Sequence, residues 1–480
     1  MSNHNQYDAI VVGSGPNGLA AAITMQQQGL SVLIIEGKDT IGGGMRTQEL
    51  TLPGFHHDVC SAIHPMALGS PFFATLPLAE HGLEFTYAPI EAAHPFDDGS
   101  AAFLSRSTTE TANSLGIDGK KYLDLIEPIV ANWEALAQDT MGPFRFPKHP
   151  LLLAKFGLNA LLPANITANK FKTQTARGLW AGMSAHAIQP FDNWASSAIG
   201  LVLLAVGHRY GWPIPKGGSQ AIAHALASYF ISLGGQIQTG HFVSDVEELP
   251  KHKALLLDLT PKQILKIAGK QLAGGYQKQL SKYRYGMGVF KVDWALDGPV
   301  PFKNEYCSNA ATVHLGNTYE EIAGSEEVTS KGGHPDKPFV LFAQQSVFDS
   351  SRAPEGKQTA WAYCHVPNGS TKDMTSAIEN QVERFAPGFK DRILAKSTLN
   401  SRELEAYNPN YIGGDINGGI IDLKQLYTRP IFSLMPYRTS SPSIYICSSS
   451  TPPGGGVHGM CGYHAAKTAL KDIFNIKLSL

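Results

Sequence analysis

Cysteine is scarce in this chain, and no two cysteines are closely spaced. The 480 residues include five cysteines, an odd number without a CxxC pair. They are Cys60, Cys307, Cys364, Cys447 and Cys461. This usage argues against a dithiol–disulfide flavoenzyme and against a secreted disulfide framework. The cysteines also show no metal-ligand spacing. The run 56–58 (His-His-Asp) would place neighbouring side chains on opposite faces of a strand, so no metal site is predicted.

The chain also lacks an excess of charge and a long apolar run. Its net charge of −1 provides no basic field, so no nucleic-acid partner is predicted. No apolar run reaches the ~20 residues that would span a bilayer. Residues 1–6 are polar and lead straight into the first apolar run, so no signal peptide is predicted. We therefore expect a cytoplasmic protein, either soluble or in peripheral contact with a membrane surface.

The most informative stretch is at the start of the chain. Residues 7–12 read as a buried strand, GSGPNG follows at 13–18, and a helix begins at Leu19. A second apolar strand at 31–35 ends in Glu36. Strand, glycine turn, helix, strand and acid are the parts of a dinucleotide-binding unit.

Each glycine of the turn has a separate task in such a unit. Gly13 allows the tight turn, Gly15 lets a pyrophosphate approach the backbone, and Gly18 lets the helix pack on the strand. The N-terminus of the helix offers free N–H groups to the phosphates. Glu36 is suited to bind both ribose hydroxyls of an adenosine, and its charge disfavours a 2′-phosphate.

A second glycine segment, 42–47 (GGGMRT), lies just beyond this acid. Backbone without side chains can run beside a bulky dinucleotide, and Arg46 can neutralise pyrophosphate charge with its forked donors. Together, GSGPNGLAAA and IIEGKDTIGGGMRT resemble the flavoprotein superfamily of amine oxidases and phytoene desaturases. The resemblance implies that the dinucleotide is FAD and that Arg46 lies near the pyrophosphate.

Two later regions extend this resemblance. Residues 211–246 resemble the segment by which the family returns to its FAD domain, where Val243 would hold the adenine edge. We expect strands at 236–239 and 242–246. A further buried strand, 254–261, would bring Leu259 near the adenosine. A P-loop at 216–219 is discounted, because the four-residue gap and the preceding strand are missing.

At the end of the chain, strand 443–447, a loop and glycines 454–456 precede a helix that runs to 474. This arrangement creates a second anion-binding helix start. The resemblance places it against the flavin pyrimidine. The predicted FAD contacts are Gly13, Ser14, Gly15, Pro16, Asn17, Gly18, Glu36, Gly37, Gly43, Gly44, Met45, Arg46, Val243, Leu259, Gly456, Val457, His458 and Met460. The sequence at the end of the chain resembles the phytoene-dehydrogenase-related branch more than the carotenoid desaturases themselves.

The predicted fold class is α/β: a doubly wound, Rossmann-like FAD-binding domain with an inserted α+β substrate domain. The FAD domain would comprise residues 1–74, 214–275 and 431–480. The substrate domain would comprise a helix-rich part at 75–213 and an antiparallel sheet with helices at 276–430. Apolar and polar residues alternate along the expected strand 289–296, as they do in a strand with one face toward the core. Residues 120–138 carry helical spacing.

The apolar runs 151–162 and 198–206 allow two interpretations. Either run can be a core helix, or an interfacial helix that admits a lipid-soluble substrate while cations face lipid headgroups. The glycine-rich loop 408–419 either crosses the active site or is a connector.

No catalytic base can be identified from spacing. The candidates are His64, His458 and Asp415, and the resemblance places Cys60, Ser61 and His64 near the flavin ring or leaves them as packing residues. We predict an FAD-dependent oxidoreductase that takes hydride from an apolar, isoprenoid or lipid-like substrate, with oxygen or a quinone as electron acceptor. The alternatives are a redox-neutral flavin isomerase of unsaturated lipids, a non-catalytic flavin-binding partner protein and an NAD-only dehydrogenase.

Overall fold

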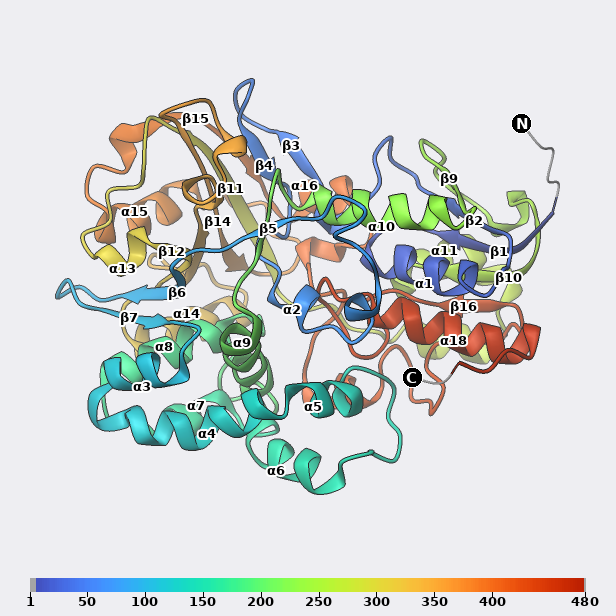
Figure 1. Cartoon of the computed structure of the whole chain (residues 1–480), viewed down its shortest axis with the longest axis horizontal. Coiled ribbons are helices and arrows are strands. Elements are labelled where there is room, and N and C mark those ends of the chain that lie inside the picture. The colour runs from blue at the N-terminus through green and yellow to red at the C-terminus, as the bar shows by residue number, and fades with distance from the viewer. Residues whose placement is uncertain (1–5, 479–480) are drawn as a thin grey trace.

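A computed structural model describes residues 6–478 of the chain, so the polar residues 1–5 lie outside it. One half of the molecule is built on a five-stranded parallel sheet with the strand order β16-β10-β1-β2-β9 (Figure 1). Its strands are β1 (Gln6–Val12), β2 (Val32–Ile35), β9 (Gln236–Gln238), β10 (Lys251–Leu257) and β16 (Ile444–Ile446). Three distant parts of the sequence therefore meet in one sheet.

Helices cover both faces of this sheet, which explains why its central strands are apolar on both sides. One face packs on α1 (Pro16–Gln26), α10 (Gln220–Ser232) and α18 (Met460–Phe474). The other face packs on α11 (Pro261–Ala268) and α12 (Gly274–Leu280). The segment 242–246 is irregular and not the strand that we expected, since it pairs with no strand and leads into a 3-10 helix (Val246–Glu248).

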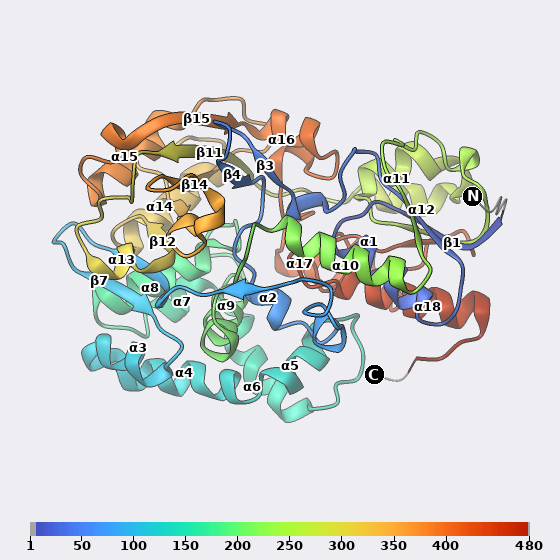
Figure 2. The ribbon, with the colours of Figure 1, turned by 45° about the horizontal axis from the view of Figure 1, so that its top comes forward.

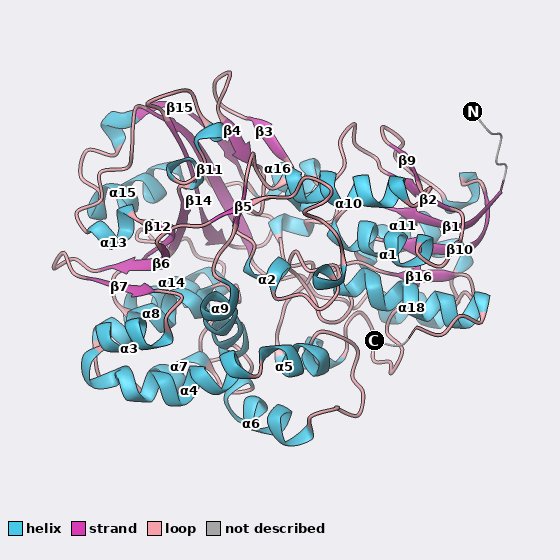
Figure 3. Cartoon of the chain, viewed as in Figure 1, coloured by secondary structure: helices cyan, strands magenta, loops and turns pink. Residues whose placement is uncertain are grey.

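A second, seven-stranded sheet forms the other half, in the order β15-β11-β14-β13-β12-β6-β7 (Figure 3). Its strands are β6 (Ile90–Pro95), β7 (Ala101–Leu104), β11 (Gly288–Leu296), β12 (Ala310–Leu315), β13 (Val340–Ala343), β14 (Gln358–Val366) and β15 (Ile393–Leu399). All neighbours are antiparallel except β6 and β12. The prediction missed β6 and β7, which come from the part expected to be helix-rich.

The strand β11 differs from its predicted pattern, because all nine of its residues are buried. One face packs on α15 (Thr375–Phe385) and the other faces the interior of the molecule. The polar residues of this strand are therefore buried among protein groups. The alternation of apolar and polar residues along β11 does not mean that one face is exposed to solvent.

A layer of helices lies beneath the second sheet, along the lower edge in Figures 1 and 2. It comprises α3 (Thr108–Ser114), α4 (Gly119–Ala131), α5 (Trp133–Thr140), α6 (Pro150–Ala160), α7 (Ala164–Ala168), α8 (Gln174–Ala185) and α9 (Ser197–Tyr210). The predicted helix 120–138 is two helices, because the chain leaves the helical conformation at Asn132. No helix within residues 6–478 has the length and apolar character needed to cross a bilayer.

The remaining elements are short or lie at the periphery. They are β3 (Thr47–Glu49), β4 (His56–Asp58), α2 (Pro65–Leu68), β5 (Phe85–Thr86), β8 (Ile214–Pro215), α13 (Glu305–Ser308), α14 (Tyr319–Ser330), α16 (Ser401–Tyr407) and α17 (Leu423–Tyr427).

A buried ion pair ties the two halves together. Arg352 donates to the Asp58 carboxylate at 2.8 Å, and neither side chain is exposed. The same carboxylate accepts from the Ser219 N–H and from the Thr47 hydroxyl. Asp58 therefore anchors β4, the turn before α10 and the segment after β13 at one point.

Candidate active site

A single large cavity runs from the carboxyl ends of β1 and β2 to the inner face of the seven-stranded sheet. The cavity end at the parallel sheet is lined by the glycine turns, and the other end by side chains of β12, β13 and β14. Ligands bind at the carboxyl ends of such parallel strands. The cavity therefore has a dinucleotide end and a second, aromatic end.

The glycine turn has the geometry that the motif requires. Gly13 has a φ of +100°, and a Cβ on Gly18 would lie 2.1 Å from the Gly13 carbonyl oxygen. Gly43 approaches Gly15 so closely that a Cβ on it would lie 3.1 Å from the Gly15 Cα. Helix α1 begins with no side-chain cap and no acid in its first turn. Bare backbone and an uncapped helix start fit a pyrophosphate, and hence the dinucleotide of FAD.

Glu36 lies on the cavity wall at the end of β2. One carboxylate oxygen accepts from the Ser14 N–H at 3.0 Å and from the Ser14 hydroxyl at 2.5 Å. The other accepts from the Lys38 N–H and lies 3.2 Å from the Arg46 guanidinium. These contacts fix the carboxylate as a charged acceptor beside the glycine turn.

Arg46 is held by protein groups beside the cavity. Its guanidinium donates to the Thr40 carbonyl and hydroxyl oxygens and to the Gly43 carbonyl oxygen. The side chain is 3% exposed. Arg46 therefore shapes the glycine segment and holds Glu36, although it also lines the cavity.

Asp258, which the sequence analysis missed, lies directly beneath the turn. Its carboxylate accepts from the Gly18 N–H at 2.9 Å. Burial raises the pKa of Asp258 to about 7, and the nearby charge of Glu36 adds to the rise. The signal in the sequence was an acidic residue directly after an apolar strand. Asp258 is 240 residues from Gly18, so only the pairing of strands in the parallel sheet connects it to the glycine turn.

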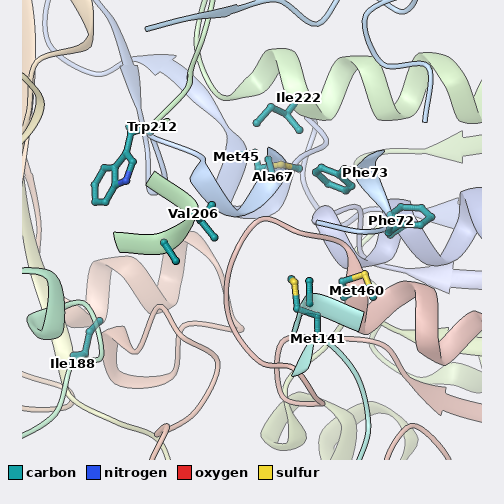
Figure 4. Packing of buried hydrophobic residues seen from close by; sticks show 14 of the residues in the cluster. Met45, Ala67, Phe72, Phe73, Met141, Ile188, Val206, Trp212, Ile222 and Met460 are labelled. Atoms are coloured by element: carbon teal, nitrogen blue, oxygen red, sulfur yellow. The ribbon is translucent and has the colours of Figure 1, made fainter. Parts of the chain in front are cut away.

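Most of the predicted contacts line the cavity. They are Gly13, Ser14, Gly15, Pro16, Asn17, Glu36, Gly37, Gly43, Gly44, Arg46, Val243, Leu259, Gly456 and Val457. Four predicted contacts lie elsewhere. Gly18 packs α1 on the sheet, and Met45 and Met460 are part of the hydrophobic cluster in Figure 4. His458 is buried, and its Nδ1 accepts from the Met460 N–H.

The three candidate bases differ in position. His64 lines the cavity, and its Nε2 lies 2.8 Å from the Ser219 hydroxyl. Burial lowers the pKa of His64 and that of His458 to about 4, so both are neutral at pH 7. The carboxylate of Asp415 accepts from the N–H groups of Gly286, Asn417 and Gly419. Those bonds organise the loop 408–419, and Asp415 itself is not part of the cavity wall.

The aromatic end of the cavity contains residues that the sequence analysis did not select. They are His186, Leu203, Trp212, Thr312, Leu341, Trp361 and Tyr363, whereas Tyr407 and Tyr411 lie against the glycine segment at the other end. Cys60 and Ser61, which were predicted near the flavin ring, lie between this end and the glycine turns. Burial raises the pKa of the Cys60 thiol. The alternating aromatic residues of 361–365 (WAYCH) were the signal for this wall in the sequence. The pairing of the strands is needed to show that these residues face the cavity.

Comparisons with known proteins agree with this geometry. A family model described as an NAD(P)-binding Rossmann-like domain matches residues 11–72. The chain is 26% identical to pyridine nucleotide-disulfide oxidoreductase domain-containing protein 2 of Mus musculus, over 98% of the chain and 94% of that protein. It is 21% identical to the lycopene-forming phytoene desaturase of Paracoccus sp., over 95% of both.

Solved structures show the same fold. Wild-type putrescine oxidase bound to putrescine matches with a TM-score of 0.62 and 16% identity, over 98% of this chain and 99% of that chain. The predicted α/β fold, with an FAD-binding domain and a substrate domain, is thereby confirmed. The sequence relatives include phytoene desaturases, as the resemblance implied, and the amine oxidases share the fold of this chain. This chain is an FAD-dependent oxidoreductase.

Proposed function

We propose that this flavoenzyme removes hydride from an apolar, isoprenoid or lipid-like substrate. The observation that carries the proposal is the continuity of the cavity from the glycine turns to a wall that includes Leu203, Leu341 and Trp361. A reacting carbon bound there would lie between the aromatic wall and the site for the cofactor ring. The name of the phytoene desaturase relative supports an isoprenoid substrate.

Within this proposal the predicted contacts have separate tasks. FAD supplies the hydride acceptor, and oxygen or a quinone would then receive the electrons. Gly13, Gly15, Gly43 and Gly44 would hold the pyrophosphate, and Glu36 would hold the ribose. Val243 and Leu259 would lie beside the adenine, while Gly456 and Val457 would lie beside the flavin ring. These assignments are supported by their common position on the cavity wall.

Proton transfer would depend on neutral groups. His64 is uncharged at pH 7 and can accept a proton only at a large free-energy cost, because its surroundings are dry. Loss of hydride from carbon must be balanced by loss of a proton from a neighbouring atom of the substrate, and the cation that precedes this loss is acidic enough for a weak base. Of the three candidates only His64 lines the cavity, so we assign it the role of accepting this proton while Ser219 positions its ring, and we assign no chemical role to His458 or Asp415.

The domain division is proposed on the same grounds. Residues 1–74, 214–275 and 431–480 would form the FAD domain, since strands from each of these segments pair in the parallel sheet. Residues 75–213 and 276–430 would form the substrate domain, whose sheet contains β6 and β7 as well as the later strands.

Peripheral contact with a membrane is the second part of the proposal. Five large apolar side chains on and near α6 are mostly exposed, and we call them the apolar rim. They are Phe146, Leu151, Leu158, Phe432 and Leu434. Leu151 and Leu158 are seven residues apart, so they occupy the same face of α6. An exposed apolar face of this kind is typical of an interaction surface.

The segments of the rim are held near one another by α18. The His464 ring bonds to the Met141 carbonyl oxygen and stacks on Tyr437, so the loop before α6 and the loop around 432–437 meet at this helix. Arg145 and Lys148 lie close enough to Lys467 to lower the pKa of Lys467, after burial as the main cause. Apolar side chains flanked by cations match an anionic lipid surface.

An anaerobic titration tests the proposed reaction. The visible spectrum of the purified holoenzyme is recorded before and after addition of a cellular lipid extract. Bleaching of the flavin bands supports a lipid-soluble reductant, and the extract can then be fractionated for the active component. Unchanged bands, together with isomerised products in the extract, would favour the redox-neutral isomerase. Unchanged bands without any product would favour a flavin-binding partner protein.

A further inference from the structure

The aromatic end of the cavity is formed by one face of the seven-stranded sheet. Thr312 on β12 pairs with Ala343 on β13, which pairs with Trp361 on β14. Two residues further along, His314, Leu341 and Tyr363 form a parallel row. Because side chains two residues apart share a face, both rows project from the same side of the sheet.

This face is unusually polar for the wall of a hydrocarbon pocket. The Thr312 hydroxyl and the Trp361 indole N–H are buried and have no hydrogen-bond partner within residues 6–478. The Tyr363 hydroxyl also makes no hydrogen bond in the described part of the chain, but its oxygen keeps accessible surface at the cavity; burial of the residue raises its pKa. All three residues line the cavity. An unmade buried hydrogen bond costs ~1–3 kcal/mol, so the Thr312 and Trp361 groups favour a partner from outside the protein, and the Tyr363 hydroxyl is free to bind the same partner.

A histidine pair completes the polar wall. His186, which follows α8, lines the cavity, and its Nε2 lies 2.9 Å from the Nε2 of His314. Burial lowers the pKa of His186 to about 3, so the ring is neutral. The Nδ1 of His314 is buried without a partner, and an unpaired nitrogen lone pair costs less there than an unpaired N–H. His314 is therefore protonated on Nε2 and donates to the Nε2 of His186. The proton of the neutral His186 ring is then on its Nδ1.

We propose that the substrate carries an oxygen function, such as a hydroxyl, carbonyl or carboxyl group, which is bound by Thr312, Tyr363 and His186. These three residues determine specificity, and they select an oxygenated substrate over a pure hydrocarbon of the same skeleton. The inference rests on the proposed function, because it assumes that the substrate occupies the aromatic end of the cavity. It narrows the substrate class from apolar compounds to amphiphilic ones.

The test compares two probes with one carbon skeleton, farnesol and farnesene. Each is titrated into the oxidised holoenzyme, and binding is followed by the change in the flavin absorbance bands. A hydrogen bond contributes ~1 kcal/mol, which is about fivefold in affinity. We expect farnesol to bind at least fivefold more tightly than farnesene. Tyr363→Phe and Thr312→Val should each weaken farnesol about fivefold and leave farnesene within twofold.

The same variants report on stability without a ligand. Their hydroxyls have no protein partner, so the melting temperature of the free holoenzyme should stay the same or rise in both variants. Tyr306→Phe, at a half-exposed tyrosine outside the cavity, is the matched control and should change neither quantity. Equal affinity for the two probes, including the case in which neither binds, would overturn the inference. So would variants that weaken both probes alike or lower the melting temperature.

Binding and turnover are read separately in this design. If the flavin is never reduced by a lipid extract but farnesol still binds more tightly than farnesene, the hydride-transfer proposal fails and the oxygen-binding wall stands. If lipids bleach the flavin while the two probes bind equally, the proposal that Thr312, Tyr363 and His186 bind a substrate oxygen fails, and the proposed reaction stands.

Discussion

The substitution Asp258→Asn tests how the buried carboxyl group beneath the glycine turn affects stability and FAD binding. In the native protein Asp258 is buried beneath the glycine turn, with 8% of the residue exposed at the cavity, and its pKa is raised from 3.8 to about 7. An acid whose folded-state pKa lies above its unfolded value stabilises the fold least at high pH. Its stability contribution is complete below pH 3.8 and is lost as the pH rises to 7.

The size of that loss follows from the shift. About three pKa units correspond to ~4 kcal/mol between pH 4 and pH 8. The asparagine side chain cannot ionise, although its oxygen can still accept from the Gly18 N–H. It gives up one acceptor, which adds a pH-independent cost of ~1 kcal/mol. Relative to the native protein, the variant should therefore gain up to ~4 kcal/mol as the pH is raised from 4 to 8.

Two assays measure this dependence. Urea unfolding of the FAD-free protein at pH 4, 6 and 8 gives the free energies of unfolding. Flavin fluorescence quenching gives the FAD affinity over the same range. The pyrophosphate is an anion, so we expect native FAD affinity to fall up to ~tenfold per pH unit above pH 7 and the variant affinity to stay flat. Asp124→Asn, at an exposed site on α4, is the control. Parallel pH profiles for the native protein and Asp258→Asn would refute the reasoning.

Glu36→Arg should reduce the flavin-to-protein ratio after purification, because it removes the ribose acceptor and leaves Ser14 and Arg46 without their carboxylate; unchanged flavin content would contradict the ribose role. Gly18→Val should abolish folding of the FAD domain, since even a Cβ would meet the Gly13 carbonyl oxygen of the glycine turn at 2.1 Å; a soluble variant with native circular dichroism would disprove the contact. Arg352→Leu should cost ~3–5 kcal/mol in urea unfolding, because it leaves a buried carboxylate unpaired, and a loss below ~1 kcal/mol would show that the pair is dispensable. Phe146→Ser combined with Leu151→Ser should abolish co-sedimentation with vesicles that contain phosphatidylserine while the flavin content stays native, whereas binding that persists would exclude the apolar rim.

The accuracy of sequence reasoning differs between the two ends of the cavity for a physical reason. The glycine turn, α1 and Glu36 lie within 24 residues, so spacing alone places them around one ligand. The same turn depends on Asp258, which arrives through the pairing of β1 with β10. Local spacing contains no information on that pairing. The acid could have been found only by first assigning the strand order of the sheet.

The apolar runs show a related difference. The sequence left 151–162 open between a core helix and an interfacial helix, because hydrophobicity does not say which face is covered. In the structure, Leu152 and Phe156 pack on the core while Leu151 and Leu158 stay exposed. Helix α6 therefore has one apolar face that packs on the protein core and a second apolar face that is exposed at the surface. A helix that is hydrophobic all round indicates a second contact, and composition alone cannot identify its partner.

The substrate end of the cavity was the hardest part to predict, because its residues share neither a segment nor a residue type. Thr312 and Tyr363 come from strands that are separated by β13, and His186 comes from the helical layer. Only the pairing of Thr312 with Ala343 and of Ala343 with Trp361 brings these side chains onto one wall. A wall that served a hydrocarbon would be more stable with valine at 312, since the Thr312 hydroxyl is buried without a protein partner, and it would gain nothing from a hydroxyl at 363. The unpaired Thr312 hydroxyl, together with the Tyr363 hydroxyl on the same wall, is therefore the physical argument that these groups contact a ligand.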